Sequence, residues 1–334
     1  MRTFRMLTGH GLPKELSQGR PTGPLSGRHR LLALALTVIA VVALVTVAAA
    51  CGKKTATKTT TVAGVKIKED STLHKMLPQA ILDAGKIRVA CDISYPPWEM
   101  YKEAGGSAVT GIDYDIAQAI GAKLGVSFNF QETTFDAIIP ALQAGKADVV
   151  FSCMYDNAER QKVLDFVDYA KDGTALLVKK GNPDKITGIQ SLAGKTVAVE
   201  SGTTQLVLLQ KAQAQFKANG LAEMKILQLP KDSDAQLAVQ SGKAVCDVTD
   251  GPGSVYVAQT AGDGNTFEVV NDPAYPNGYD PQAIGSGMVK SNTALRDAIK
   301  AALQALVDDG TYSKILEKYG QSAVAVTSIT VNLK

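Results

Sequence analysis

The sequence predicts an α/β protein built from two similar lobes with a ligand cleft between them. Helix-type and strand-type hydrophobic patterns alternate from residue 86 onward, which favours parallel sheets covered by helices. This alternation occurs in two successive series that share short motifs. With 334 residues, 45% of them hydrophobic and 20% charged, the chain has the length and composition of a globular protein with two domains.

The first series begins with a strand at 86–91 and ends with a strand at 147–151. Apolar residues recur every four positions from Ile112 to Leu124, which is the spacing of one helix face. The remaining elements expected here are a strand at 126–130, where apolar and polar residues alternate, and a helix at 138–142.

The second series repeats this order. Its expected elements are a strand at 196–200, a helix at 203–219, a strand at 224–229, a helix at 235–241 and a strand at 245–249. Each series opens with a strand that runs into a polar turn, at 91–92 and at 200–202, and Gln-x-Gly-Lys-Ala precedes the last strand of each. Since open α/β sheets bind ligands at the carboxyl ends of their strands, two facing lobes make a cleft that closes about a hinge.

The first 50 residues predict export from the cytoplasm. Residues 31–50 are uncharged and follow Arg28 and Arg30, as in a signal peptide, and the small residues before Cys51 resemble a lipobox. We expect a signal peptide at 1–50, a lipidated Cys51 that anchors the chain to the outer face of the membrane, and a flexible tether at 51–72. The alternatives are an uncleaved membrane anchor and ordinary cleavage without lipid; all three place the rest of the chain outside the cytoplasm.

Charge and cysteine content exclude some classes of function. Six of the 35 Lys and Arg residues and one of the 32 Asp and Glu residues lie in 1–50, so residues 51–334 carry 29 basic and 31 acidic groups, a net charge of −2. This balance gives no reason to expect nucleic-acid binding. Cys91 and Cys153 either pair in a disulfide or stay buried free thiols, and we expect no metal site.

Six motifs occur in order between residues 75 and 322. They are Tyr-Pro-Pro-Trp-Glu at 95–99, Gly-Ile-Asp-Tyr-Asp-Ile-Ala at 111–117, Phe-Asp-Ala-Ile-Ile-Pro-Ala-Leu at 135–142, Ala-Glu-Arg at 158–160, Ser-Gly-Thr-Thr-Gln at 201–205 and Asp-Gly-Thr-Tyr at 309–312. Together they resemble the polar amino-acid-binding proteins of ABC importers, solute-binding family 3.

That resemblance implies a periplasmic-binding-protein-like fold of type II, in which two crossover strands join the lobes. Lobe 1 would comprise 73–178 and 288–334, and lobe 2 would comprise 179–287. The resemblance also implies an amino-acid ligand, an ABC permease and ATPase as partners, a monomer and no cofactor.

The same resemblance assigns the two ends of the ligand. Arg160 matches the residue that clamps the ligand carboxylate, for which a planar guanidinium is suited. Thr203 and Thr204 open a helix whose free N–H groups favour an anion, although this pattern is also that of a helix N-cap. Asp250 matches the acceptor of the ligand ammonium group; the alternative is a helix cap before Gly251.

Other family positions surround the ligand side chain. Tyr95 and Phe135 match aromatic residues that sandwich the aliphatic part of the ligand. Asp92 matches a residue that touches the ligand side chain in some members, and Ser152 is a further candidate. Tyr155 stands where the family usually has a small hydroxyl residue, so it is expected to fill part of the cleft. Asp113 and Asp115 match structural positions.

An enzyme on the same fold, such as a periplasmic dehydratase, is the main alternative function. The three histidines are His10, His29 and His74; the first two leave with the signal peptide and the third precedes the first strand, so we expect no histidine-based catalysis in the cleft. A ligand-sensing partner of a receptor is a third possibility. The sequence does not identify the amino acid.

Overall fold

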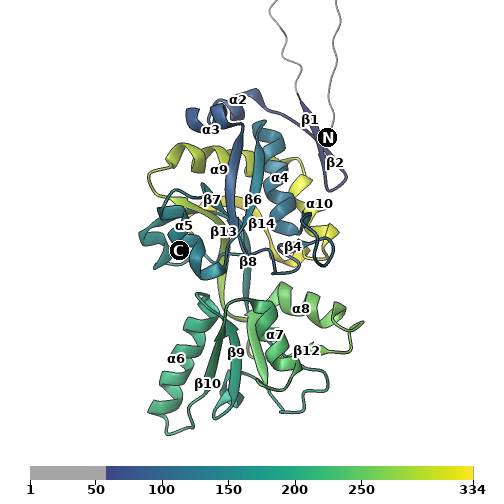
Figure 1. The fold of residues 1–334 in the computed structure, drawn as a ribbon, viewed down its shortest axis with the longest axis vertical. Coiled ribbons are helices and arrows are strands. Elements are labelled where there is room, and N and C mark those ends of the chain that lie inside the picture. Colours follow the sequence, from purple (N-terminus) through teal and green to yellow (C-terminus); the bar gives the residue numbers. More distant parts are fainter. Residues whose placement is uncertain (1–57, 334) are drawn as a thin grey trace, which may run out of the picture. The chain divides into compact units, whose positions relative to one another are not determined.

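The computed structural model describes residues 58–333 (Figure 1). The expected signal peptide at 1–50 and the expected lipidation site Cys51 lie outside these residues. Within 58–333, no helix combines the length and the apolar character needed to cross a membrane.

The sequence predicts a flexible tether at 51–72, but residues 59–68 form a β-hairpin. β1 (Thr59–Val62) pairs antiparallel with β2 (Val65–Lys68). Val62 and Ile67 are buried in the core of the first lobe. The tether prediction is therefore wrong for this segment, because a short polar strand pair is stabilised by packing that its own sequence does not reveal.

The first lobe is built on a parallel sheet in the order β6-β3-β7. β3 (Lys86–Cys91) lies between β6 (Ser127–Glu132) and β7 (Val149–Val150), so the strand expected at 147–151 is present but short. The other elements of this lobe are α2 (Ser71–His74), α3 (Gln79–Ala84), β4 (Met100–Tyr101), β5 (Val109–Thr110), α4 (Ile112–Leu124), η1 (Phe135–Ala137), α5 (Ile138–Gln143), α9 (Thr293–Asp308), α10 (Thr311–Lys318) and η4 (Ser322–Val324).

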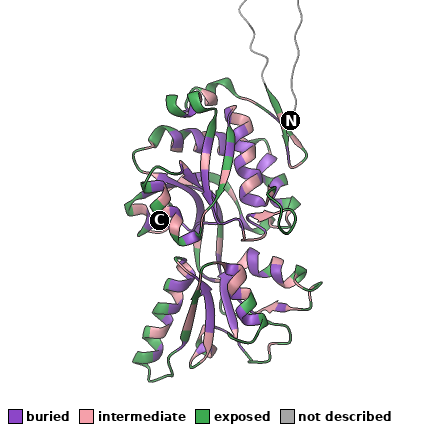
Figure 2. Cartoon of the chain, viewed as in Figure 1, coloured by how far each residue is buried: buried purple, intermediate pink, exposed green. Residues whose placement is uncertain are grey.

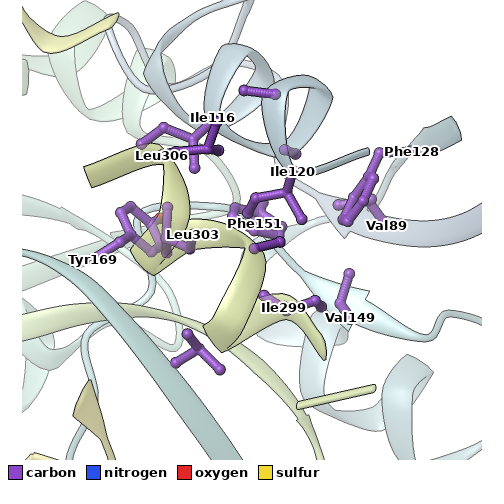
Figure 3. Close-up of a cluster of buried hydrophobic side chains, with 14 of the residues drawn as sticks. Val89, Ile116, Ile120, Phe128, Val149, Phe151, Tyr169, Ile299, Leu303 and Leu306 are labelled. Carbon is purple, nitrogen blue, oxygen red and sulfur yellow. The ribbon is translucent and has the colours of Figure 1, made fainter. Parts of the chain in front are cut away.

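The core of the first lobe lies between this sheet and the helices α4 and α9 (Figure 3). Ile116 and Ile120 of α4 are fully buried, as the four-residue spacing predicts. Phe151 stacks on Tyr169 with ring centroids 5.7 Å apart and meets Phe128 edge-on at 5.9 Å. These contacts fix the end of β7, from which the segment toward Arg160 departs.

Two long antiparallel strands, β8 (Leu164–Lys179) and β13 (Tyr279–Val289), join the lobes (Figure 1). The first half of β8 pairs with β13 and with β14 (Ala325–Val331), whereas its second half pairs with strands of the second lobe. These are the two crossover strands of the expected type II fold. The pairing partners of β8 change near Asp172, so the boundary between the lobes falls inside this strand. The boundary expected from the sequence lies later, at 178/179.

The second lobe is built on β10-β9-β11, extended by β8 and β12. Its elements are η3 (Ile189–Leu192), β9 (Thr196–Glu200), α6 (Thr204–Ala218), β10 (Lys225–Leu229), α7 (Asp232–Gln240), β11 (Cys246–Asp250), α8 (Gly251–Thr260) and β12 (Phe267–Val269). α6 buries Leu209 and Phe216 against the sheet, and α7 and α8 bury Ala235 and Val257 in a separate cluster. Figure 2 shows these strands buried between helices with exposed outer faces.

Cys91, Cys153 and Cys246 are buried free thiols. Of the two alternatives for Cys91 and Cys153, the structure therefore has the free thiols and not the disulfide. Burial raises the pKa of all three thiols well above its ordinary value, which keeps them protonated.

Asp168 of β8 lies against Asp156 beside the last strand. Asp168 accepts hydrogen bonds from Thr330 and from the backbone N–H of Leu333. Burial raises the pKa of Asp168 to about 7, and the neighbouring Asp156 carboxyl contributes to the rise. Because the pKa of an aspartic acid in the unfolded chain is about 3.9, the folded protein binds more protons than the unfolded chain between these two pKa values. The stability of the folded protein therefore falls as the pH rises through that window.

We therefore expect the melting temperature to fall as the pH is raised from 5 to 8. Asp168→Asn should make this decline shallower, whereas Glu103→Gln, at an exposed carboxyl, should leave it unchanged. Thermal melts at several pH values measure the effect. Equal slopes for the wild type and Asp168→Asn would contradict the assignment.

Candidate functional site

A small cavity lies where strands of the two lobes end. Its lining comes from both lobes: Asp92, Tyr95, Phe135, Ser152, Cys153, Tyr155, Arg160, Glu200, Thr203, Thr204 and Gln205. All the ligand-binding residues expected from the sequence are in this lining except Asp250. The carboxyl ends of β3 and β9 supply Asp92 and Glu200, as the strand-end rule predicts.

Arg160 begins the short helix η2 (Arg160–Lys162) and is only 8% exposed. Its guanidinium donates to the carbonyl of Tyr155 at 2.7 Å and to that of Gly202 at 3.1 Å, and it lies 5.3 Å from the Phe135 ring centroid. None of the ion pairs among residues 58–333 includes Arg160. Burial lowers its pKa to about 10, so the group remains a cation at neutral pH and, without a carboxylate partner, provides a site for an anion.

The helix α6 begins beside Arg160. The Thr203 hydroxyl accepts from the N–H of Leu206 and donates to the carbonyl of Glu200, so it acts as a helix N-cap, the alternative expected for this position. Both Thr203 and Thr204 still line the cavity. The N-terminus of this 15-residue helix therefore adds a partial positive charge close to the guanidinium.

Asp250 is fully buried at the end of β11 and caps α8. Its Oδ2 accepts from the N–H of Gly253 at 3.0 Å and from the indole of Trp98 at 2.9 Å. The expected alternative, a helix cap before Gly251, is therefore present. Its Oδ1 is buried without a hydrogen-bond partner in the described part of the chain. Asp250 does not line the cavity, but its backbone N–H donates to the hydroxyl of Tyr95, which does.

The two aromatic residues predicted to hold a ligand side chain lie on the cavity as expected. Phe135 lies in η1 under Arg160. The Tyr95 hydroxyl is 2.7 Å from Oγ1 of Thr249, across the two lobes. These two rings, one from the loop after β3 and one from η1, give the cavity apolar walls between its charged groups.

Two carboxyl groups line the same cavity. Oδ1 of Asp92 accepts from the N–H of Ser94 and lies 4.0 Å from the Lys231 ammonium, while its Oδ2 is buried without a partner. Glu200 is 3% exposed, and its Oε1 is also buried without a partner. Burial raises the pKa of both groups.

Ser152 and Tyr155 serve mainly as wall residues. The Ser152 hydroxyl donates to Glu99 and accepts from the backbone of Asp92, so its hydrogen-bonding capacity is used inside the protein. Tyr155 offers its carbonyl to Arg160 and its hydroxyl to Asp172 on β8. The unusual tyrosine thus connects the cavity wall to a crossover strand.

Asp113 and Asp115, expected to be structural, lie on α4 away from the cavity. Asp113 accepts from the backbone of Cys153 and from Tyr169, and Asp115 pairs with Lys318. Both side chains therefore hold elements of the first lobe together.

The lobes contact each other around the cavity. Besides the Tyr95 and Trp98 contacts, Lys231 of the second lobe donates to Ser94 at 3.1 Å and to Glu132 at 2.6 Å. Gly202, with φ of 79°, lies so close to Asp136 that an added Cβ would come within 3.0 Å of its Cα. These contacts are those of a closed cleft.

Three cavity residues are not among those expected from the sequence: Cys153, Glu200 and Gln205. Glu200 had a usable signal, because it ends the first strand of the second series just as Asp92 follows the first strand of the first series. Gln205 lies in the motif that contains Thr203 and Thr204. Cys153 had none, since its positive φ of 43° comes from the turn after β7.

A sequence model of the bacterial extracellular solute-binding proteins, family 3, matches residues 87–322. The chain is also 30% identical over 241 residues to the putative ABC transporter arginine-binding protein 2 of Escherichia coli (strain K12). That match covers 71% of this chain and 92% of the relative.

Two solved structures share the fold. An ancestral arginine-binding protein bound to arginine superposes with a TM-score of 0.62 at 35% identity, covering 71% of this chain and 98% of that one. The ancestral amino acid-binding protein AncCDT-1, a precursor of cyclohexadienyl dehydratase, gives a TM-score of 0.63 at 33% identity, covering 75% and 99%.

Proposed function

The chain belongs to the bacterial extracellular solute-binding proteins, family 3, and we propose that it is the solute-binding component of an ABC importer that captures one amino acid between its lobes. The observation that carries this proposal is Arg160, a buried cation on the interlobe cavity with no carboxylate partner in residues 58–333. A ligand carboxylate supplies the missing charge, and the start of α6 adds to the attraction.

In this account each end of the ligand has its own partner. Arg160 and the N-terminus of α6 receive the carboxylate. The ammonium group goes to the free Oδ1 of Asp250, which becomes accessible from the cavity when the side chain of Tyr95, whose hydroxyl contacts Asp250, moves aside. Tyr95 and Phe135 enclose the aliphatic part. Closure of the lobes around the ligand creates the form that an ABC permease and its ATPase recognise.

We further propose that the protein acts outside the cytoplasm as a monomer, anchored to the membrane through a lipidated Cys51. The support for export and anchoring is the sequence pattern of 28–51. Globomycin, which inhibits the lipoprotein signal peptidase, should cause the uncleaved precursor to accumulate, and Cys51→Ser should release the protein from the membrane fraction. A membrane-bound Cys51→Ser variant would contradict lipid anchoring.

We propose a binding role and not catalysis. One similar structure is an ancestral amino acid-binding protein from which a dehydratase arose, so the fold itself does not decide between the two. His74 does not line the cavity, and its Nδ1 is hydrogen-bonded to the carbonyl of Leu124. Arg160 on the cavity is hydrogen-bonded to carbonyl groups and Thr203 caps the start of α6, an arrangement suited to holding an anionic group of a solute.

Calorimetric titration of the purified protein with the twenty amino acids, ornithine and citrulline tests the proposal. At least one should bind with one ligand per protein. The matching 2-keto acid, which lacks the ammonium group, and the matching primary amine, which lacks the carboxylate, serve as controls and should bind much more weakly. No heat from any amino acid would refute amino-acid binding.

A further inference from the structure

The hairpin of β1 and β2 has one face on the first lobe and one face in solvent. Val62 and Ile67 are buried in the core of the lobe. Side chains alternate between the two faces of a strand, so Lys66 and Lys68 point to the opposite face, where both are exposed. Lys58, directly before β1, is exposed as well. These three residues are called the hairpin lysines below.

No carboxylate within residues 58–333 forms an ion pair with any of the hairpin lysines. The two acidic residues that follow the hairpin are engaged with the lobe instead. Asp70 caps the start of α2, and the carboxyl group of Glu69 lies against Gly125 at the end of α4. The outer face of the hairpin therefore presents positive charge that its nearest carboxyl groups do not pair with.

Positive charge is concentrated in the segment that contains the hairpin. Of the 29 basic and 31 acidic groups of residues 51–334, six basic and two acidic ones lie in 51–75, a net charge of +4. Residues 76–334 therefore carry 23 basic and 29 acidic groups, a net charge of −6. A negatively charged surface attracts the first segment and repels the remainder, so it favours one orientation of the protein.

The hairpin also lies close to the expected lipid attachment site along the chain. Lys58 follows Cys51 by seven residues, which span at most about 25 Å when fully extended. Both strands of the hairpin pack on α4, at the end of the first lobe remote from the second lobe (Figure 1). A lipid on Cys51 therefore keeps the hairpin lysines within that distance of the membrane surface.

We propose that the hairpin lysines bind the anionic headgroups of the membrane to which Cys51 is anchored, and so hold the first lobe against the membrane with the second lobe directed away from it. This inference rests on the proposed lipid anchor, although the contact itself needs only the folded hairpin. At physiological salt an exposed charge acts over only about 8 Å, so three lysines alone bind weakly. The contact orients a chain that its lipid already holds, which agrees with release of Cys51→Ser from the membrane fraction.

The experiment is sedimentation of the mature chain, residues 51–334 with Cys51→Ser, together with lipid vesicles. The hydrophobic cores of both lobes lie within this chain. Vesicles of phosphatidylcholine alone are compared with vesicles that contain about one third phosphatidylglycerol, at about 20 mM and about 300 mM salt. The protein should bind the anionic vesicles and not the neutral ones, and the higher salt concentration should release it.

The triple variant Lys58→Gln/Lys66→Gln/Lys68→Gln should bind the anionic vesicles about 100-fold more weakly, since each lysine near such a surface contributes roughly 5-fold. Amino-acid binding and the melting temperature should be unchanged, because the three side chains are exposed and do not line the cavity. The matched control removes three exposed lysines of the second lobe and should change vesicle binding little: Lys217→Gln, Lys225→Gln and Lys243→Gln.

The possible results separate this inference from the proposed function. The membrane contact is refuted if the mature chain does not bind anionic vesicles at low salt, if it binds neutral vesicles equally well, or if the hairpin variant and the control variant lose the same affinity. Each of these results leaves amino-acid binding and lipid anchoring standing. If no amino acid binds, the proposed function fails, and vesicle binding by the hairpin is still decided by its own measurement.

Discussion

Arg160→Ala should weaken amino-acid binding by about 2–5 kcal/mol, which is roughly 30-fold to several thousand-fold. The guanidinium is buried on the cavity, and within residues 58–333 its hydrogen-bond partners are carbonyl groups, so its charge is available to a ligand carboxylate. Titration calorimetry against the ligand found in the amino-acid screen measures the loss.

Two matched variants sharpen this test. Arg160→Lys keeps the charge but loses the planar fork, so its affinity should lie between those of the wild type and Arg160→Ala. Lys162→Ala removes a cation two residues away, whose side chain is 66% exposed, and should leave binding unchanged. Wild-type affinity in a folded Arg160→Ala variant would remove Arg160 from the site.

Asp250→Asn should weaken binding by a similar amount, about 2–5 kcal/mol, without lowering the melting temperature. Asparagine is as good an N-cap as aspartate and can still accept from Gly253 and Trp98, so the start of α8 is preserved. It also removes a buried carboxyl group whose pKa is raised by burial, which relieves an unfavourable charge.

Asp250→Ala provides the contrast, because it removes the cap and the charge together. It should lose binding and, in addition, about 0.5–2 kcal/mol of stability. If Asp250→Asn binds as the wild type does, Asp250 acts only as the cap of α8 and the ammonium group has another partner.

The order of helices and strands could be predicted from the sequence because burial of one face requires a different spacing of apolar residues in a helix than in a strand. The four-residue spacing of Ile112, Ile116 and Ile120 places all three in the core. The hairpin at 59–68 could not be predicted, since only Val62 and Ile67 of it are buried and their packing partners come from elsewhere in the chain. Local sequence does not reveal contacts that only the folded lobe supplies.

The candidate site was predictable where a motif marks it. Arg160, Tyr95 and Phe135 lie on the cavity as expected. Glu200 was not expected because only the topology of the sheet brings the end of its strand to the cavity. The likeness between the two series of strands was too weak to assign a role to a single residue. For Asp250 the difficulty is different, since an aspartate that caps a helix and an aspartate that binds a ligand have the same local sequence.

The most direct test of the account is a crystal structure of the protein grown with its amino-acid ligand. We expect ligand density in the cavity between Tyr95 and Phe135, with the ligand carboxylate paired with the Arg160 guanidinium and with the first N–H groups of α6. Ligand density elsewhere, or a carboxylate that does not contact Arg160, would contradict it.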